Sequence, residues 1–176
     1  EVRTSSNTGN LYFGTYSGQY DNGSFQNTAF GNGTLQNNTT GAINTAVGTG
    51  ALQNNVSGQY NTAIGQAALT ANLSGSFNTA VGQNALGSNT TGGYNTALGV
   101  SALSNNTTGH DNIAIGEAVA TANTTGYSNI FIGVDSSYSN TTGHDNVAIG
   151  NNAFTSNISG FNNVIVGVGA GQSVTG

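Results

Sequence analysis

Short segments of this chain place larger, mostly apolar side chains at every second residue, and these segments recur every 17 residues. Ten asparagines, from Asn10 to Asn163, mark the repeat, and each is followed four residues later by a glycine. We number the repeat positions from this asparagine, so that Asn10 stands at position 1 of the first repeat. A fixed short period is typical of a stack in which each repeat packs only against its neighbours.

Repeat positions 2 to 4 carry the pattern of a short strand. Position 4 is apolar in all ten repeats, and position 2 exchanges threonine with β-branched or leucine residues. Because alternate residues of a strand face one side, positions 2 and 4 are predicted to point into the core. Position 9, mostly leucine, and position 13, where threonine alternates with apolar residues, are predicted to join them. The apolar period is 2 rather than 3.6, so helix is not expected.

The predicted fold is therefore all-β, a parallel β-solenoid (β-roll) of ten 17-residue coils. Glycines at positions 5 and 15 are expected at corners, with a left-handed or otherwise special backbone angle at position 5. Residues 1–176 are predicted to form a single domain, in which residues 27–176 make regular coils. Residues 1–26 are expected to form an atypical, aromatic-rich cap or docking coil, because terminal repeats cap a stack.

Two surfaces are predicted to contact other subunits. If positions 2 and 4 face inward, position 3 faces outward, and a small apolar column there suits close packing against another chain. The alternative is a solvent-facing strand without a partner. The aromatic first coil offers a second contact. The residues predicted at these contacts are Tyr12, Tyr16, Phe25, Ala46, Ala63, Ala80 and Ala97.

The negative net charge and the scarcity of basic residues limit the partners that are expected. The 176 residues include one Lys or Arg and six Asp or Glu, and the net charge is −5. Nucleic acids and anionic membranes are therefore not expected as partners, because both are bound by clustered basic residues. No apolar run approaches the ~20 residues of a membrane span, and no signal peptide is visible. The chain has no cysteine, so disulfides and thiolate metal sites are excluded.

An Asn-x-Ser/Thr triplet recurs at repeat positions 12 to 14 in eight coils. We consider three interpretations: a hydrogen-bonded amide ladder along the axis, a row of N-glycosylation acceptors, and a flat array that orders water, as in ice-binding solenoids. The residues concerned are Asn38, Thr40, Asn55, Ser57, Asn72, Ser74, Asn89, Thr91, Asn106, Thr108, Asn123, Thr125, Asn140, Thr142, Asn157 and Ser159.

Catalytic constellations are not evident. The two histidines, His110 and His144, stand two coils apart, so about 10 Å along the axis, which is too far to ligate one metal ion together. Each precedes Asp-Asn, and a polar corner is favoured over a metal or pH-sensitive spot. We predict no enzyme activity, no cofactor and no metal.

Several motifs carry a resemblance to a known family. The segments 112–116 (Asn-Ile-Ala-Ile-Gly) and 146–150 (Asn-Val-Ala-Ile-Gly) resemble the repeat in head domains of trimeric autotransporter adhesins. The longer pattern over 78–92 is similar to repeats in bacterial surface proteins and phage tail-fibre-like proteins. The resemblance covers roughly residues 10–170. It implies a left-handed parallel β-roll, often trimeric, in an extracellular adhesive or structural fibre.

We therefore predict a structural subunit of an extracellular fibre or adhesive shaft, self-associating end to end, laterally or both. The expected partner is the chain itself, as a trimer or a head-to-tail filament, with a surface or glycan as an alternative ligand. The expected location is extracellular or at the cell surface. The alternative function is an ice-binding β-solenoid that uses a flat Asn/Thr ladder.

Overall fold

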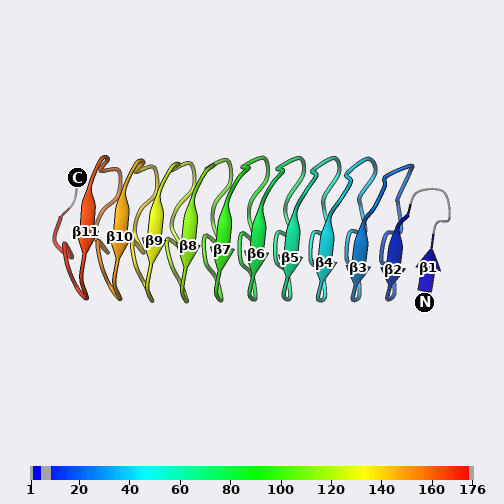
Figure 1. The fold of residues 1–176 in the computed structure, drawn as a ribbon, viewed down its shortest axis with the longest axis horizontal. Coiled ribbons are helices and arrows are strands. Elements are labelled where there is room, and N and C mark those ends of the chain that lie inside the picture. The colour runs from blue at the N-terminus through cyan, green and yellow to red at the C-terminus, as the bar shows by residue number, and fades with distance from the viewer. Residues whose placement is uncertain (1, 5–8, 175–176) are drawn as a thin grey trace.

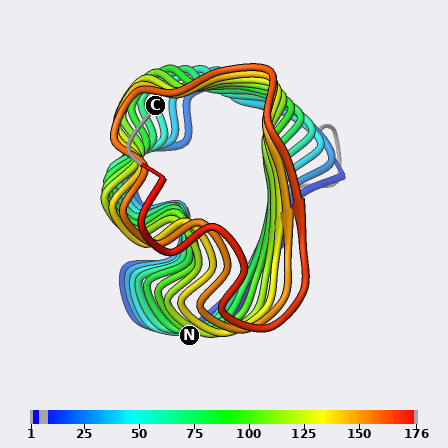
Figure 2. The ribbon, with the colours of Figure 1, turned by 90° about the vertical axis from the view of Figure 1, so that its left-hand side faces the viewer.

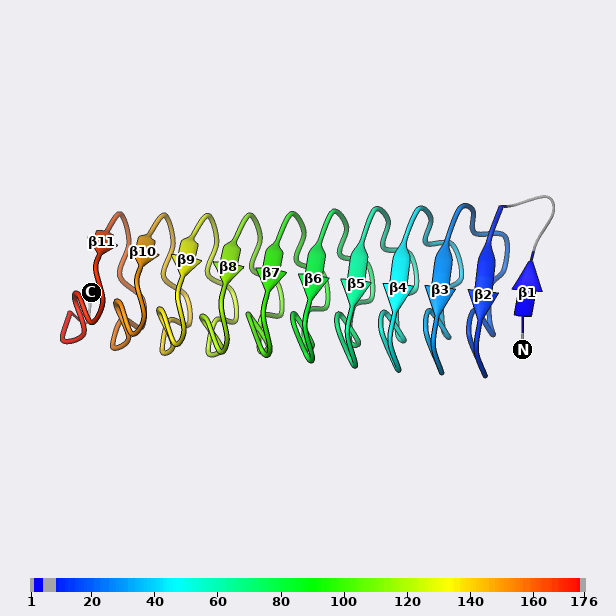
Figure 3. The same cartoon turned by 60° about the horizontal axis from the view of Figure 1, so that its bottom comes forward.

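The computed structural model describes residues 2–4 and 9–174, and in these ranges it contains strands and turns but no helix. Ten parallel strands, one from each repeat, lie side by side in chain order (Figures 1 and 3). They are β2 (Leu11–Phe13), β3 (Thr28–Phe30), β4 (Thr45–Val47), β5 (Thr62–Ile64), β6 (Thr79–Val81), β7 (Thr96–Leu98), β8 (Ile113–Ile115), β9 (Ile130–Ile132), β10 (Val147–Ile149) and β11 (Val164–Val166). The predicted parallel β-solenoid is confirmed.

Strand pairing keeps the 17-residue register throughout. Each residue of a parallel strand pairs with the residue 17 positions away, as Ala80 does with Ala97. Figure 2 looks along the stack and shows the coils superimposed, with a gradual drift from one end to the other. Like side chains therefore form columns that run along the axis.

The edge of β2 is covered by an additional strand that the repeat pattern did not predict. Strand β1 (Val2–Thr4) pairs antiparallel with β2, with Val2 opposite Phe13. A stack of parallel strands would otherwise leave an unpaired strand edge at each end. At the edge of β2 the main-chain donors and acceptors pair with β1 instead.

The core is built from repeat positions 3, 8 and 9. The position-3 alanines from Ala46 to Ala97 are fully buried, and so are the position-9 leucines from Leu35 to Leu103. The prediction for position 9 is confirmed. A column of alanines at position 8 (Ala51, Ala68, Ala85, Ala102 and Ala153), which the pattern left unassigned, completes the core.

The prediction that positions 2, 4 and 13 face inward is wrong. Ile115 at position 4 and Ile113 at position 2 are 36% and 37% exposed, and Leu73 at position 13 is 45% exposed. The physical reason lies one residue before the strand. Asn112 at position 1 is fully buried, and positions 1 and 3 share a face of the strand. The buried asparagine thus turns the alanine inward and the larger apolar residues outward.

Side-chain volume is balanced across the core between positions 3 and 9. Where position 3 is large, position 9 is small: Tyr12 lies with Gly18, Phe131 with Ser137, and Ile165 with Gly171. A Cβ added to Gly18 would lie 2.6 Å from the Tyr12 ring, and one added to Gly171 would lie 3.1 Å from Ile165. These contacts show that the two positions fill the same space.

Three positions in each coil take the left-handed conformation, mostly without glycine. Asn84 at position 7, Leu103 at position 9 and Tyr94 at position 17 have φ of 56°, 52° and 59°. Position 5 is glycine in every coil, with φ between +118° and +142°, which confirms the special angle predicted there. Three left-handed turns and one glycine corner therefore close each short coil.

Candidate functional site

A ladder of buried asparagines at position 1 ties successive coils together. The Asn78 side-chain oxygen accepts a hydrogen bond from the Asn95 backbone N–H at 3.0 Å. The Asn95 side-chain nitrogen donates to the Gly109 carbonyl at 2.8 Å. The same backbone bond to the preceding asparagine recurs from Asn27 to Asn163. This ladder explains why position 1 is asparagine in every coil.

A second amide ladder runs through position 12. Asn106 donates from Nδ2 to Oδ1 of Asn89 at 2.8 Å, and Asn89 donates in turn to Asn72 at 2.9 Å. The same bond links the column from Asn38 to Asn157. All these asparagines are fully buried. The structure therefore matches the first interpretation of the Asn-x-Ser/Thr triplet, the hydrogen-bonded ladder.

Burial of the position-12 asparagines argues against the other two interpretations of that triplet, N-glycosylation and a flat array of amides and hydroxyls. A glycan on Nδ2 of Asn89 would have to occupy the interior, where this atom already donates hydrogen bonds to Asn72 and Gly92. The hydroxyl column at position 14, which includes Thr91, is exposed. The predicted two-column surface of amides and hydroxyls is thus wrong in its amide half, because only the hydroxyl column reaches the surface.

The outward face of the parallel sheet carries two columns of predominantly β-branched residues. Position 2 contributes threonine from Thr28 to Thr96 and aliphatic residues from Ile113 to Val164. Position 4 contributes valine, isoleucine and leucine after two stacked phenylalanines, Phe13 and Phe30, whose ring centroids lie 4.5 Å apart. No residue of β2 to β11 is charged. We call this surface, positions 2 and 4 of β2 to β11, the sheet face.

Of the residues predicted to contact another subunit, some are buried within the chain and others are exposed. Ala46, Ala63, Ala80 and Ala97 are fully buried within their own chain, so the prediction that they contact another subunit is wrong. Tyr12 is 4% exposed and also belongs to the core. Tyr16 and Phe25 are more than half exposed, and their role as contacts stays a prediction.

Tyr12 is part of a polar cluster that ends the ladders at the first coil. Its hydroxyl donates to Oδ2 of Asp21 at 3.0 Å, and Asn10 donates to the same oxygen at 2.7 Å. Asp21 stands at position 12, where the next eight coils have asparagine. Burial, assisted by the nearby Asp21 carboxylate, raises the pKa of Tyr12 to about 12. The Tyr12 phenol therefore stays protonated in the folded chain well above pH 10.

Two stacks of aromatic rings run along the surface at positions 16 and 17. In one, Tyr60, Phe77 and Tyr94 stack with centroids 4.8 Å apart. The other consists of His110, Tyr127, His144 and Phe161, with centroids 4.7 to 5.2 Å apart. These stacks were not predicted from the sequence, although the recurrence of rings at intervals of 17 residues is the signal for them.

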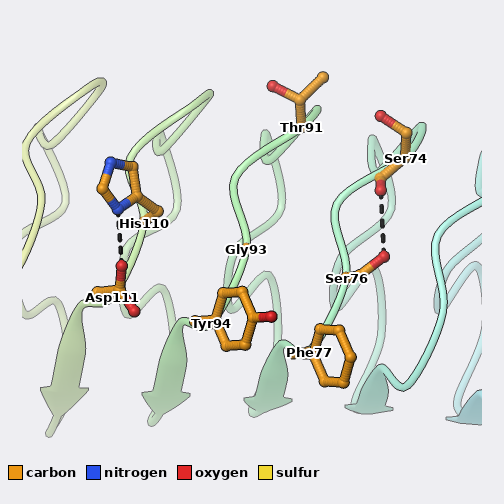
Figure 4. A pocket seen from close by; sticks show the side chains of 8 residues that line it. All are labelled: Ser74, Ser76, Phe77, Thr91, Gly93, Tyr94, His110 and Asp111. Atoms are coloured by element: carbon orange, nitrogen blue, oxygen red, sulfur yellow. Dashed lines mark hydrogen bonds and ion pairs between the residues drawn. The ribbon is translucent and has the colours of Figure 1, made fainter.

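A shallow notch of about 420 Å³ lies where the two stacks end (Figure 4). Its lining residues are Ser74, Ser76, Phe77, Thr91, Gly93, Tyr94, His110 and Asp111. Nδ1 of His110 lies 2.8 Å from Oδ2 of Asp111, and both side chains are about half exposed. His144, by contrast, is stacked between Tyr127 and Phe161.

No catalytic or metal-binding arrangement is evident among the described residues of the notch. The described part of the chain holds no group of three or more metal-ligating His, Cys, Asp or Glu side chains. The Ser76 hydroxyl in the notch donates to the Ser74 carbonyl, and the His110 imidazole pairs with Asp111. That the protein has no enzyme activity stays a prediction.

None of the described residues forms a helix long and apolar enough to span a membrane.

The fold defines this chain as a parallel β-solenoid. No family model matches it, and neither a curated protein nor a solved structure shows significant similarity to it. The resemblance to adhesin heads and tail-fibre-like proteins therefore stays a prediction, as does the left-handed sense that it implies.

Proposed function

We propose that this chain is a structural subunit of an extracellular fibre or adhesive shaft, which self-associates laterally through the sheet face. The observation that carries the proposal is that the uncharged, largely apolar columns along the ten parallel strands are exposed or half-buried. Contiguous exposed apolar surface of this kind marks interaction sites in soluble proteins. The partner that we propose for it is a second copy of the chain.

The spacing of the sheet face supports a copy as its partner. Its columns repeat at the spacing of adjacent strands, about 4.8 Å. A second copy presents the same spacing, so that two faces can match rung by rung over their whole length. Ten strands of three residues form a strip of ~48 Å by ~10 Å. Two such strips bury ~960 Å² together, near the lower limit for a specific interface.

Charge also favours contact at this face. The chain carries a net charge of −5, which opposes association of copies. The acidic residues of the regular coils lie at positions 6, 7 and 17, whereas the sheet face has none. Copies can therefore approach through the sheet face without bringing carboxylates into the contact. The extracellular location is part of the proposal, and a chain without Lys, Cys or Met suits exposed conditions.

The test is sedimentation of two matched double variants. Ile113→Lys with Val147→Lys places two charges on the sheet face in coils that are not adjacent. Thr108→Lys with Thr142→Lys places the same charges on the exposed position-14 column. We expect the unaltered protein and the position-14 variant to sediment as oligomers, and the sheet-face variant as a monomer. An unaltered protein that stays monomeric at high concentration would contradict lateral association.

Ice binding is a second candidate function, and the threonines of the sheet face support it better than the columns at positions 12 and 14 do. The threonines from Thr28 to Thr96 stand on five adjacent strands of the sheet face, which gives a regular array of hydroxyls and methyls. The aliphatic second half and the bulky Phe13 and Phe30 rings favour a protein partner over ice. Thermal hysteresis from a monomeric protein, abolished by Thr62→Lys, would favour ice binding instead.

A further inference from the structure

We propose that the notch over Gly93 binds one ring of a neutral, hydroxyl-rich sugar, stacked on His110. This proposal is independent of self-association, because the notch lies on the position-14 to position-17 surface and not on the sheet face. The site is defined by Gly93, which leaves a gap in the position-16 column between the end of the ring stack at His110 and the Ser76 side chain.

The missing side chain at Gly93 leaves a slot of about one ring's thickness. His110 stacks on Tyr127 with one face of its imidazole. The residue that would cover its other face is Gly93, at the same repeat position one coil earlier, and Gly93 has no side chain. The next side chain along the column is Ser76. Two rungs separate the His110 and Ser76 coils, so about 9.6 Å, and a ring inserted midway would lie about 4.8 Å from each. This distance matches the ring spacings found in the two stacks.

The slot is also bordered by a second free ring. Tyr94, in the same coil as Gly93, stacks on Phe77 with one face. At its repeat position the next coil has Asp111, whose carboxylate turns toward Nδ1 of His110 (Figure 4). Tyr94 is 60% exposed, the most exposed ring of its stack. A ligand in the slot therefore meets aromatic surface from both stacks.

The polar groups of the notch favour a sugar over a flat aromatic ligand. The negative face of an aromatic ring attracts the polarised C–H groups of a sugar ring. The wall opposite His110 carries the Ser76 hydroxyl, which donates to the Ser74 carbonyl at 3.3 Å. The exposed Thr91 hydroxyl lies in the coil of Gly93 itself. The Asp111 carboxylate accepts hydrogen bonds and repels anions. A hydroxyl-bearing ring can form hydrogen bonds with the Asp111 carboxylate and the Thr91 hydroxyl, whereas a flat hydrocarbon ring offers these groups none.

Saturation-transfer NMR on the whole chain provides the test, with four neutral disaccharides as probes: maltose, cellobiose, lactose and mannobiose. Sialyllactose serves as the anionic comparison, and indole as the flat aromatic comparison. We expect transfer from aromatic protons to ring C–H protons of at least one neutral disaccharide. Sialyllactose should show weaker transfer than lactose because of Asp111.

Three variants locate the site. Gly93→Gln places in the slot the residue that Gln59 provides at the same position two coils earlier. A Cβ at residue 93 would lie 2.9 Å from the Ser76 carbonyl oxygen, so this variant requires a small local backbone shift. Tyr94→Ser removes the bordering ring and places serine where Ser128 tolerates the same left-handed angle. Tyr60→Ser is the matched control, because Tyr60 ends the same stack away from the notch. Circular dichroism establishes that each variant is folded.

We expect Gly93→Gln and Tyr94→Ser to weaken binding at least tenfold, and Tyr60→Ser to leave it unchanged. The proposal is overturned if no neutral disaccharide binds the unaltered protein, or if binding survives in both folded notch variants. Binding of indole without any disaccharide would also overturn it, in favour of a planar ligand. Failure here leaves the sedimentation behaviour of the sheet-face variants unaffected, so the two proposals are tested separately.

Discussion

Coil 129–145 provides a direct test of which way the strands face. In this coil Phe131 replaces the usual alanine at position 3, and Ser137 replaces the usual leucine at position 9. Both are fully buried, and the Ser137 hydroxyl is the one buried polar side-chain atom without a partner among the described residues. Changing both residues to Ala and Leu would convert the coil to the pattern of its neighbours.

The single changes should each be destabilising. Phe131→Ala removes a buried ring opposite a small residue and leaves a cavity, which costs about 3 to 5 kcal/mol of unfolding free energy. Ser137→Leu forces extra volume against the Phe131 ring, which costs about 1 to 3 kcal/mol. If the two sites were independent, the double variant would lose the sum, about 4 to 8 kcal/mol.

The double variant should instead recover most of the stability. The leucine introduced at position 9 would fill the space left by the Phe131 ring, as Leu86 does opposite Ala80. The change also removes the unpaired hydroxyl, whose burial costs about 1 to 3 kcal/mol. We therefore expect a coupling free energy of at least ~3 kcal/mol between the two substitutions, at the upper end for contacting residues.

The measurement is urea-induced unfolding of the four proteins, followed by far-ultraviolet circular dichroism, with Ile115→Ala as a sheet-face control. A cooperative transition with equal slopes allows the free energies to be compared. Additive losses in the double variant would refute the assignment of positions 3 and 9 to one core. A small effect of Phe131→Ala beside a large effect of Ile115→Ala would reinstate the opposite strand orientation.

Four further outcomes follow from the same structure. Ile115→Asp, on the sheet face, should lower the free energy of unfolding in urea by only about 1 kcal/mol, whereas a buried charge would unfold the coil. Asn89→Ala breaks the position-12 ladder and should cost about 3 kcal/mol in the same assay, because buried amides lose partners. Ala67→Gly should cost almost nothing in thermal unfolding, since Ala67 has φ of 58°, whereas Ala68→Gly in the core should cost about 1 kcal/mol. Burial raises the pKa of Tyr12 from 10.0 to about 12, which corresponds to about 3 kcal/mol of folding stability. This contribution is fully present below pH 10 and is lost as pH rises through about 12. Tyr12→Phe should therefore remove the highest step of the absorbance titration of the tyrosines.

The repeat made the architecture predictable, because a strict period permits only stacking of like on like. Period 2 at positions 2 to 4 locates every parallel strand within its coil, and the invariant glycine at position 5 locates a corner. Alternation alone does not say which face is inside. The more apolar face was assigned to the core, and that assignment neglected the asparagine at position 1. A residue such as Asn112 is buried because its side-chain amide accepts from the Asn129 N–H of the next coil and donates to the Gly126 carbonyl of its own coil.

The information needed to orient the strands was nevertheless present in the sequence. Tyr12 occurs with Gly18, Phe131 with Ser137, and Ile165 with Gly171, so that a large residue at position 3 always accompanies a small one at position 9. Such compensation arises only between side chains that share a space, because interiors are packed without room for both. The residues at positions 2 and 4 show no such partner, as expected of side chains that the chain itself leaves uncovered. In a solenoid, therefore, a pair of columns in which large and small side chains compensate each other identifies the core more reliably than hydrophobicity does. Columns of large apolar side chains that show no such compensation are where an external partner should be sought.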